Sequence, residues 1–167
     1  MEPRRDTFPR LLLHHADVRG AHPAVREKDL GIWQTWTWKQ FADEVRSLAC
    51  GLAAQGFKRG DHLAIVGDNR PHLYTGLVAA GMLVGHAMPI YPDAAPDEVT
   101  HAVQSCGVRF VLAEDQEQVD KILDLREKCP SIEHIVCDDP RGLAAYSDPG
   151  LISWQAPHSA ASSGVLT

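Results

Sequence analysis

Short apolar strands alternate with helices along most of this sequence, and this order restricts the fold more than any other feature. The stretch HLAIVGDNRPHLYTGL, residues 62–77, shows the pattern clearly, because the apolar run Leu63–Val66 stops at a turn and a helix begins. We expect that helix to run from about Pro71 to Val84, apolar nearly all round, and to lead into a strand over Ala87–Tyr91. Such a strand–helix–strand unit is expected to be parallel and right-handed.

The same order recurs in the second half of the chain. The predicted elements are a helix from Pro96 that Gly107 ends, a strand over 108–114, a helix capped by Asp115 and Gln118 that Pro130 stops, and a strand over 133–139. This alternation predicts an α/β fold, a layered and mainly parallel sheet with flanking helices.

The N-terminal part differs, because it predicts a β-hairpin followed by one strongly amphipathic helix. Asp29 and Gly31 supply turn chemistry within AVREKDLGIWQTWTW, residues 24–38. Thr37 and Gln40 form a candidate capping box for the helix, which Gly56 can close. Three tryptophans in this region are expected to be half-buried hairpin residues rather than base-stacking platforms: Trp33, Trp36 and Trp38.

Length and charge narrow the class of protein. A chain of 167 residues suits one compact domain, and a net charge of −6 argues against binding to nucleic acid. No apolar run reaches membrane length, and LLLHHADV is too short for the core of a signal peptide, so we expect a cytoplasmic protein. The adjacent His14 and His15 are interpreted as solvated or capping residues, because metal ligands need a different spacing.

The spacing of the four cysteines also agrees with a cytoplasmic protein. Cys50, Cys106, Cys129 and Cys137 form no C-x-x-C pair, which favours a reducing compartment and argues against zinc.

The turn GDNRP, residues 67–71, is the natural place to look for a nucleotide site, because strand-to-helix turns often hold phosphates. It carries only one glycine of a G-x-G-x-x-G fingerprint. Asp68 would repel phosphate, Pro71 removes an amide donor, and Arg70 is expected to be solvated or paired with a nearby carboxylate. Asp68 or Asn69 is instead predicted to cap the helix.

Other catalytic patterns are absent from the sequence. It contains no Walker loop and no G-x-S-x-G elbow, and no lysine follows Lys128. The pairs Glu114–Asp115 and Asp138–Asp139 are interpreted as caps and turns rather than general acids and bases. We therefore predict no catalytic, cofactor-binding or metal-binding residue in this chain.

The order of segments resembles the N-terminal part of the AMP-forming acyl-CoA synthetases, within the adenylate-forming ligase superfamily, and the long-chain fatty acid group most of all. TWTWKQFADEV and LVAAGMLVGHAMPIYP resemble two core motifs of the family. GDNRP, EDQEQVDKI and CDDPRGLAAYSDPGLISW extend the resemblance, which covers about Asp6 to Trp154, while residues 155–167 are predicted to be a loose tail outside it. Pro92 stands where the long-chain group often has glutamine.

The resemblance implies the incomplete N-terminal part of a ligase that uses ATP, magnesium, a fatty acid and coenzyme A. The phosphate loop with its lysine, expected after LISW, and the C-terminal domain are not found. A truncated and inactive ligase that self-associates through an exposed core is therefore expected, with no cofactor of its own. Two alternatives stay open: a non-catalytic binding or interaction module built on this scaffold, and a small nucleotide-binding domain.

Overall fold

A five-stranded parallel sheet forms the centre of the computed structural model, which describes residues 6–154. The strand order is β4-β3-β5-β6-β7, and all four pairings are parallel. The bounds are β3 His62–Val66, β4 His86–Ile90, β5 Phe110–Ala113, β6 His134–Cys137 and β7 Leu151–Ser153. The predicted α/β class and parallel sheet are confirmed. The predicted tail, residues 155–167, lies outside the described residues.

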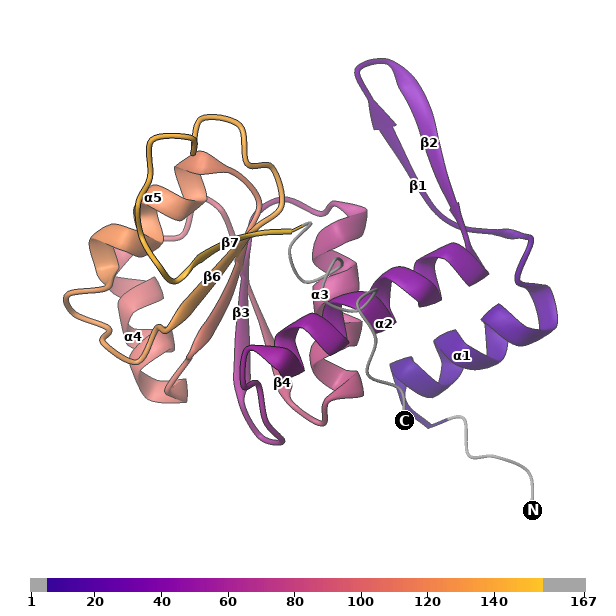
Figure 1. Ribbon diagram of the computed structural model, residues 1–167, viewed down its shortest axis with the longest axis horizontal. Helices are drawn as coiled ribbons and strands as arrows, with labels where there is room; N and C mark the ends of the chain where they lie inside the picture. The colour runs from indigo at the N-terminus through magenta and orange to yellow at the C-terminus, as the bar shows by residue number, and fades with distance from the viewer. Residues whose placement is uncertain (1–5, 155–167) are drawn as a thin grey trace.

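Helices cover both faces of this sheet (Figure 1). Their bounds are α1 Phe8–Arg19, α2 Trp38–Ala54, α3 Pro71–Met82, α4 Pro96–Cys106 and α5 Gln116–Leu125. One core cluster joins α2 and α3 to side chains such as Leu63, Ile65 and Leu112, and the other joins α4 and α5 to Ala64, Val66 and Val111. Alternate residues of the strands thus serve opposite faces, as the pleat requires. Helix α1 packs outside α2 and α3.

The N-terminal hairpin, β1 Pro23–Asp29 paired with β2 Ile32–Thr37, stands away from the sheet (Figure 1). Its turn places Leu30 and Gly31 at φ values of 45° and 84°, the positive pair that a two-residue turn of this kind needs. The predicted burial of the tryptophans is correct for Trp36 and Trp38, although Trp38 already belongs to α2. It is wrong for Trp33, which is 60% exposed, because this end of the hairpin pairs only with itself.

Local signals explain most helix ends. Thr37 and Gln40 form the predicted capping box of α2, and Gly56, at φ 89°, follows its C-cap. The side chain of Asp115 accepts a bond from the Gln118 amide at the start of α5, also as predicted. The predicted cap of α3 is wrong: Arg70 is its N-cap residue and makes no side-chain capping bond, although Pro71 does lie in the first turn.

Candidate functional site

The carboxyl edge of the sheet is the place where open parallel sheets bind their ligands. In this chain β3, β5 and β6 are followed at that edge by Gly67, Glu114 and Asp138. The amides of Glu114 and Asp138 bond to carbonyl groups of the neighbouring strands, Val66 and Ala113, so the ends of the strands remain tied together. The acidic residues that the sequence assigned to caps and turns therefore meet along one edge.

The β3–α3 corner already holds an anion, and that anion is the carboxylate of Glu114. The backbone amide of Asp68 donates to Glu114 Oε2 at 2.6 Å, and Arg70 Nε pairs with Glu114 Oε1. Glu114 is only 8% exposed. Arg70 also contacts Glu27 of the hairpin at 3.4 Å. Arg70 was expected to be either solvated or paired with a nearby carboxylate, and the structure shows the pairing.

Glu114 also explains why Gly67 is needed at this corner. Gly67 has φ 152°, and a Cβ built there would lie 2.5 Å from the Cβ of Glu114. The donors that a phosphate would need are bonded to a side chain, and the space in front of them is filled. The residues at this corner therefore do not fit the phosphates of ATP.

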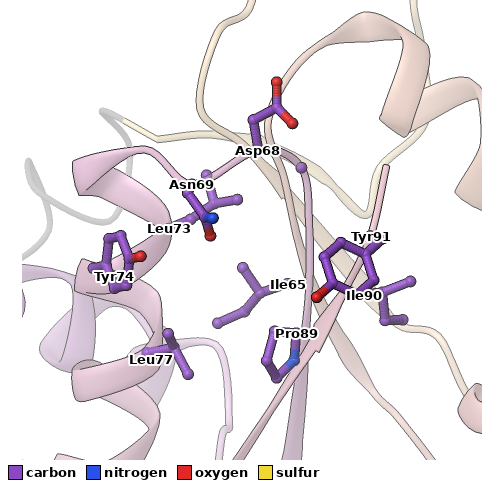
Figure 2. A pocket seen from close by; sticks show the side chains of 10 residues that line it. Ile65, Asp68, Asn69, Leu73, Tyr74, Leu77, Pro89, Ile90 and Tyr91 are labelled. Atoms are coloured by element: carbon purple, nitrogen blue, oxygen red, sulfur yellow. The ribbon is translucent and has the colours of Figure 1, made fainter. Parts of the chain in front are cut away.

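A cavity of about 340 Å³ lies beside the corner, between α3 and the edge strand β4 (Figure 2). Ile65 and Pro89 form its floor, and Leu73 and Leu77 of α3 form one wall. Tyr91, which is 80% exposed, stands at the end of β4. Further lining residues are Asp68, Asn69, Tyr74 and Ile90. The cavity is mainly apolar, so it suits a hydrophobic segment better than a nucleotide.

Sequence reasoning missed a polar cluster on the other side of α3. His72 Nδ1 lies 2.6 Å from Asp138 Oδ1, and the ring of Trp154 stacks on the imidazole at 4.8 Å between centroids. Trp36 Nε1 donates to Glu44 at 2.8 Å, and its ring meets His72 edge-on. The only available signal was that His72 opens a helix and Asp138 follows a strand, and 66 positions separate them.

Burial and neighbouring charges shift the pKa values of this cluster. Burial lowers the pKa of His72, but the bond to Asp138 and the charges of Asp138, Glu44 and Glu27 outweigh it, so the net shift is upward. Burial raises the pKa of Glu44, although the charge of His72 and the bond from Trp36 oppose this. The upward shift of the pKa stabilises the imidazolium form of His72 beside the Asp138 carboxylate.

The remaining residues that the sequence analysis considered take part in structural contacts or are buried. All four cysteines are free, and burial raises the pKa of the Cys137 thiol to about 12, which makes it unreactive. His15 lies 3.2 Å from Arg19 Nε and packs against Trp38. Asp139 pairs with Arg141, which lowers the pKa of the Asp139 carboxyl.

No group of three or more His, Cys, Asp or Glu residues between positions 6 and 154 could hold a metal ion. Within the same range, none of the helices has the length and apolar character that crossing a bilayer needs.

Comparison with known proteins identifies sequence relatives. A family model described as AMP-binding enzyme matches residues 12–161. An uncharacterised protein of Mycobacterium tuberculosis is 34% identical over 116 residues, which are 70% of this chain and 64% of that protein. A long-chain-fatty-acid–CoA ligase of Xenopus laevis is 25% identical over 149 residues, which are 89% of this chain and 20% of the ligase. The chain thus spans less than two thirds of either relative.

A solved structure shows the same fold. Acetoacetyl-CoA synthetase from Streptomyces lividans superposes with a TM-score of 0.79 at 21% sequence identity. The match covers 90% of this chain and 24% of the synthetase. At that identity the likeness concerns the fold, and it places the five-stranded sheet and its helices within an adenylate-forming ligase architecture.

Proposed function

The chain belongs to the AMP-binding enzyme family, and from this premise we propose that it provides the N-terminal α/β part of a ligase that joins a fatty acid to coenzyme A. The observation that carries the proposal is the match to the Xenopus laevis ligase, which extends over 89% of this chain. The proposed parent reaction converts ATP, a fatty acid and coenzyme A into acyl-CoA, AMP and pyrophosphate, with magnesium assisting.

Within that reaction we assign this chain a scaffolding role, with no catalytic, cofactor-binding or metal-binding residue of its own. Glu114 takes up the Asp68 amide and the Arg70 guanidinium, which are the donors that a phosphate at the β3–α3 corner would need. No lysine follows Lys128 to supply a phosphate loop. The 167-residue chain is therefore expected to be inactive alone, and its four free cysteines suit a reducing compartment such as the cytoplasm.

Turnover by the purified chain tests this proposal. We expect no AMP or pyrophosphate to form from ATP when palmitate, magnesium and coenzyme A are added. The intact Xenopus laevis ligase, assayed in parallel, is the positive control for the reagents. AMP formation that depends on the fatty acid and persists through repurification would contradict the inactive reading and place a functional site within this chain.

A second candidate function is a non-catalytic interaction module that has kept the scaffold. The specific observation in its favour is the Mycobacterium tuberculosis relative, because 116 aligned residues make up 64% of it and it is therefore itself a short protein. The turnover assay does not separate the two candidates, since both are inactive. The association state of the chain separates them.

A further inference from the structure

The turn between β1 and β2 presents apolar side chains to solvent. Leu30 is 91% exposed, Ile32 is 66% exposed and Trp33 is 60% exposed. Figure 1 shows that this turn is the end of the hairpin that points away from the helices and from the central sheet. Large apolar side chains that gather on a projecting turn mark a surface that contacts something outside the chain.

The conformation of the turn does not call for leucine at position 30. Leu30 has φ 45°, and Gly31 follows at φ 84°. Asn-Gly is the pair that such a turn prefers, because asparagine adopts a positive φ at a lower cost than leucine does. The chain thus keeps an apolar, solvent-exposed side chain where the backbone favours a polar one. A side chain that is unfavourable for the local backbone indicates a role beyond folding.

One face of the hairpin is basic and aromatic. The register pairs residue 26 with 35 and residue 28 with 33, which places four exposed side chains on this face: Arg26, Lys28, Trp33 and Thr35. The guanidinium carbon of Arg26 lies 5.4 Å from the centroid of the Trp33 ring, and Arg26 Nε donates to Thr35 Oγ1 at 3.3 Å. Two cations and a tryptophan therefore face solvent together, next to the apolar turn.

The acidic residues of the hairpin, Glu27 and Asp29, lie on the opposite face, because successive residues of a strand alternate. Glu27 is half-buried and contacts Arg70 of the β3–α3 corner at 3.4 Å. The bond and charge of Asp139, followed by the charge of Asp29, raise the pKa of Arg141. Both acidic residues thus interact with basic groups of other segments, and the outward face of the hairpin stays positive.

We propose that the hairpin docks on the surface of a lipid bilayer that contains anionic lipids. Leu30 and Trp33 enter the boundary between headgroups and acyl chains, and the basic face contacts the lipid phosphates. Tryptophan suits this depth because its ring is amphipathic, and a negative membrane surface attracts lysine and arginine.

Nucleic acid fits the hairpin less well than a membrane does. Exposed Leu30 and Ile32 add nothing to base stacking, and the net charge of −6 repels a polyanion along the rest of the chain. The membrane proposal concerns the hairpin alone and does not depend on the ligase proposal.

Co-sedimentation of the complete 167-residue chain with lipid vesicles tests the proposal. The probes are vesicles of phosphatidylcholine alone and vesicles of phosphatidylcholine and phosphatidylserine in equal amounts. The chain is expected to bind the mixed vesicles, to bind them more weakly as salt is added, and to bind phosphatidylcholine alone far less. No binding to the mixed vesicles would overturn the proposal, and equal binding to both kinds would contradict the role given to the basic face.

Leu30→Asn separates membrane binding from folding. Asparagine suits φ 45°, so urea denaturation should show a variant at least as stable as the parent protein. The variant loses the apolar side chain and should bind the mixed vesicles about tenfold more weakly. Val84→Asn is the matched control, because Val84 lies outside the hairpin, is 54% exposed and has φ 59°. Unchanged binding by Leu30→Asn, or an equal loss in both variants, would overturn the assignment to the hairpin.

Lys28→Gln tests the basic face. It should weaken binding to the mixed vesicles about fivefold at low salt, whereas Lys58→Gln, an exposed lysine in the turn before β3, should leave binding unchanged. Equal effects of the two lysine variants would contradict the proposed contact. Single-stranded oligothymidine is the competing probe. If the chain binds it, and Lys28→Gln weakens that binding while Leu30→Asn does not, the hairpin is a nucleic-acid site and the membrane proposal is wrong.

Discussion

At the residue scale, His72 makes the stability of this protein depend on pH. Because its folded-state pKa is raised above the ordinary value of 6.5, its stabilising contribution is complete below that value and is lost as the pH rises through the folded-state pKa. Asp138, Glu44 and Glu27 are the charged groups that produce the rise. We expect the free energy of unfolding, measured by urea denaturation, to fall as the pH rises above the ordinary histidine value of about 6.5.

Asp138→Asn isolates this contribution. The variant removes the charge that His72 contacts, so it should cost about 1–2 kcal/mol at pH 6 and less at pH 8. The slope of stability against pH should flatten accordingly. Asp17→Asn, on the exposed side of α1, is the control and should keep the slope of the parent protein. If Asp138→Asn kept the full slope of stability against pH, a group other than His72 would be responsible for that slope.

At the scale of elements, sequence reasoning succeeded where a capping signal and a periodic pattern agreed. Helices α2 and α5 start where Thr37 and Asp115 predicted. It missed α1, which buries only Leu12, and β7, whose three residues are a strand only because they pair with β6. It also missed the partner of His72 and did not identify which carboxylate pairs with Arg70, because such contacts depend on tertiary structure and leave no local pattern.

Helix α3 offers a matched pair of glycines for an element-scale prediction. A Cβ at Gly76 would lie 2.5 Å from Leu112 Cδ2, and Leu112 is 1% exposed and has little room to move. At Gly81 the nearest atom, on Pro9, is 3.4 Å away. Gly76→Ala should therefore lower the free energy of unfolding by about 1–2 kcal/mol through overpacking. Gly81→Ala should raise it by up to about 1 kcal/mol through helix propensity.

Urea denaturation of the two variants measures both effects, and each is the control for the other. Opposite signs would show that the small residue at Gly76, and not glycine in general, lets α3 approach the sheet. Stabilisation by both substitutions would mean that Leu112 can adopt another rotamer, and the close packing of α3 on β5 would then not require glycine.

At the scale of the whole molecule, one edge of the sheet leads to a proposal about association. Within residues 6–154, strand β4 pairs only with β3, and the apolar cavity of Figure 2 opens beside it. Tyr91 and Tyr74 at this cavity are 80% and 43% exposed, and Val84 nearby in the chain is 54% exposed. An exposed apolar surface beside an open sheet edge favours contact with another chain.

We therefore expect the isolated chain to self-associate through the β4 edge, and sedimentation velocity over a range of concentrations measures this directly. Tyr91→Lys places a charge beside the cavity and should shift the equilibrium toward monomer. Leu30→Lys is the matched control, because Leu30 is 91% exposed at the tip of the hairpin, and it should leave the association unchanged. A monomer at every concentration, with one cooperative thermal transition, would instead favour the self-standing interaction module. An equal response to the two lysine variants would point to a general loss of apolar surface and not to the β4 edge.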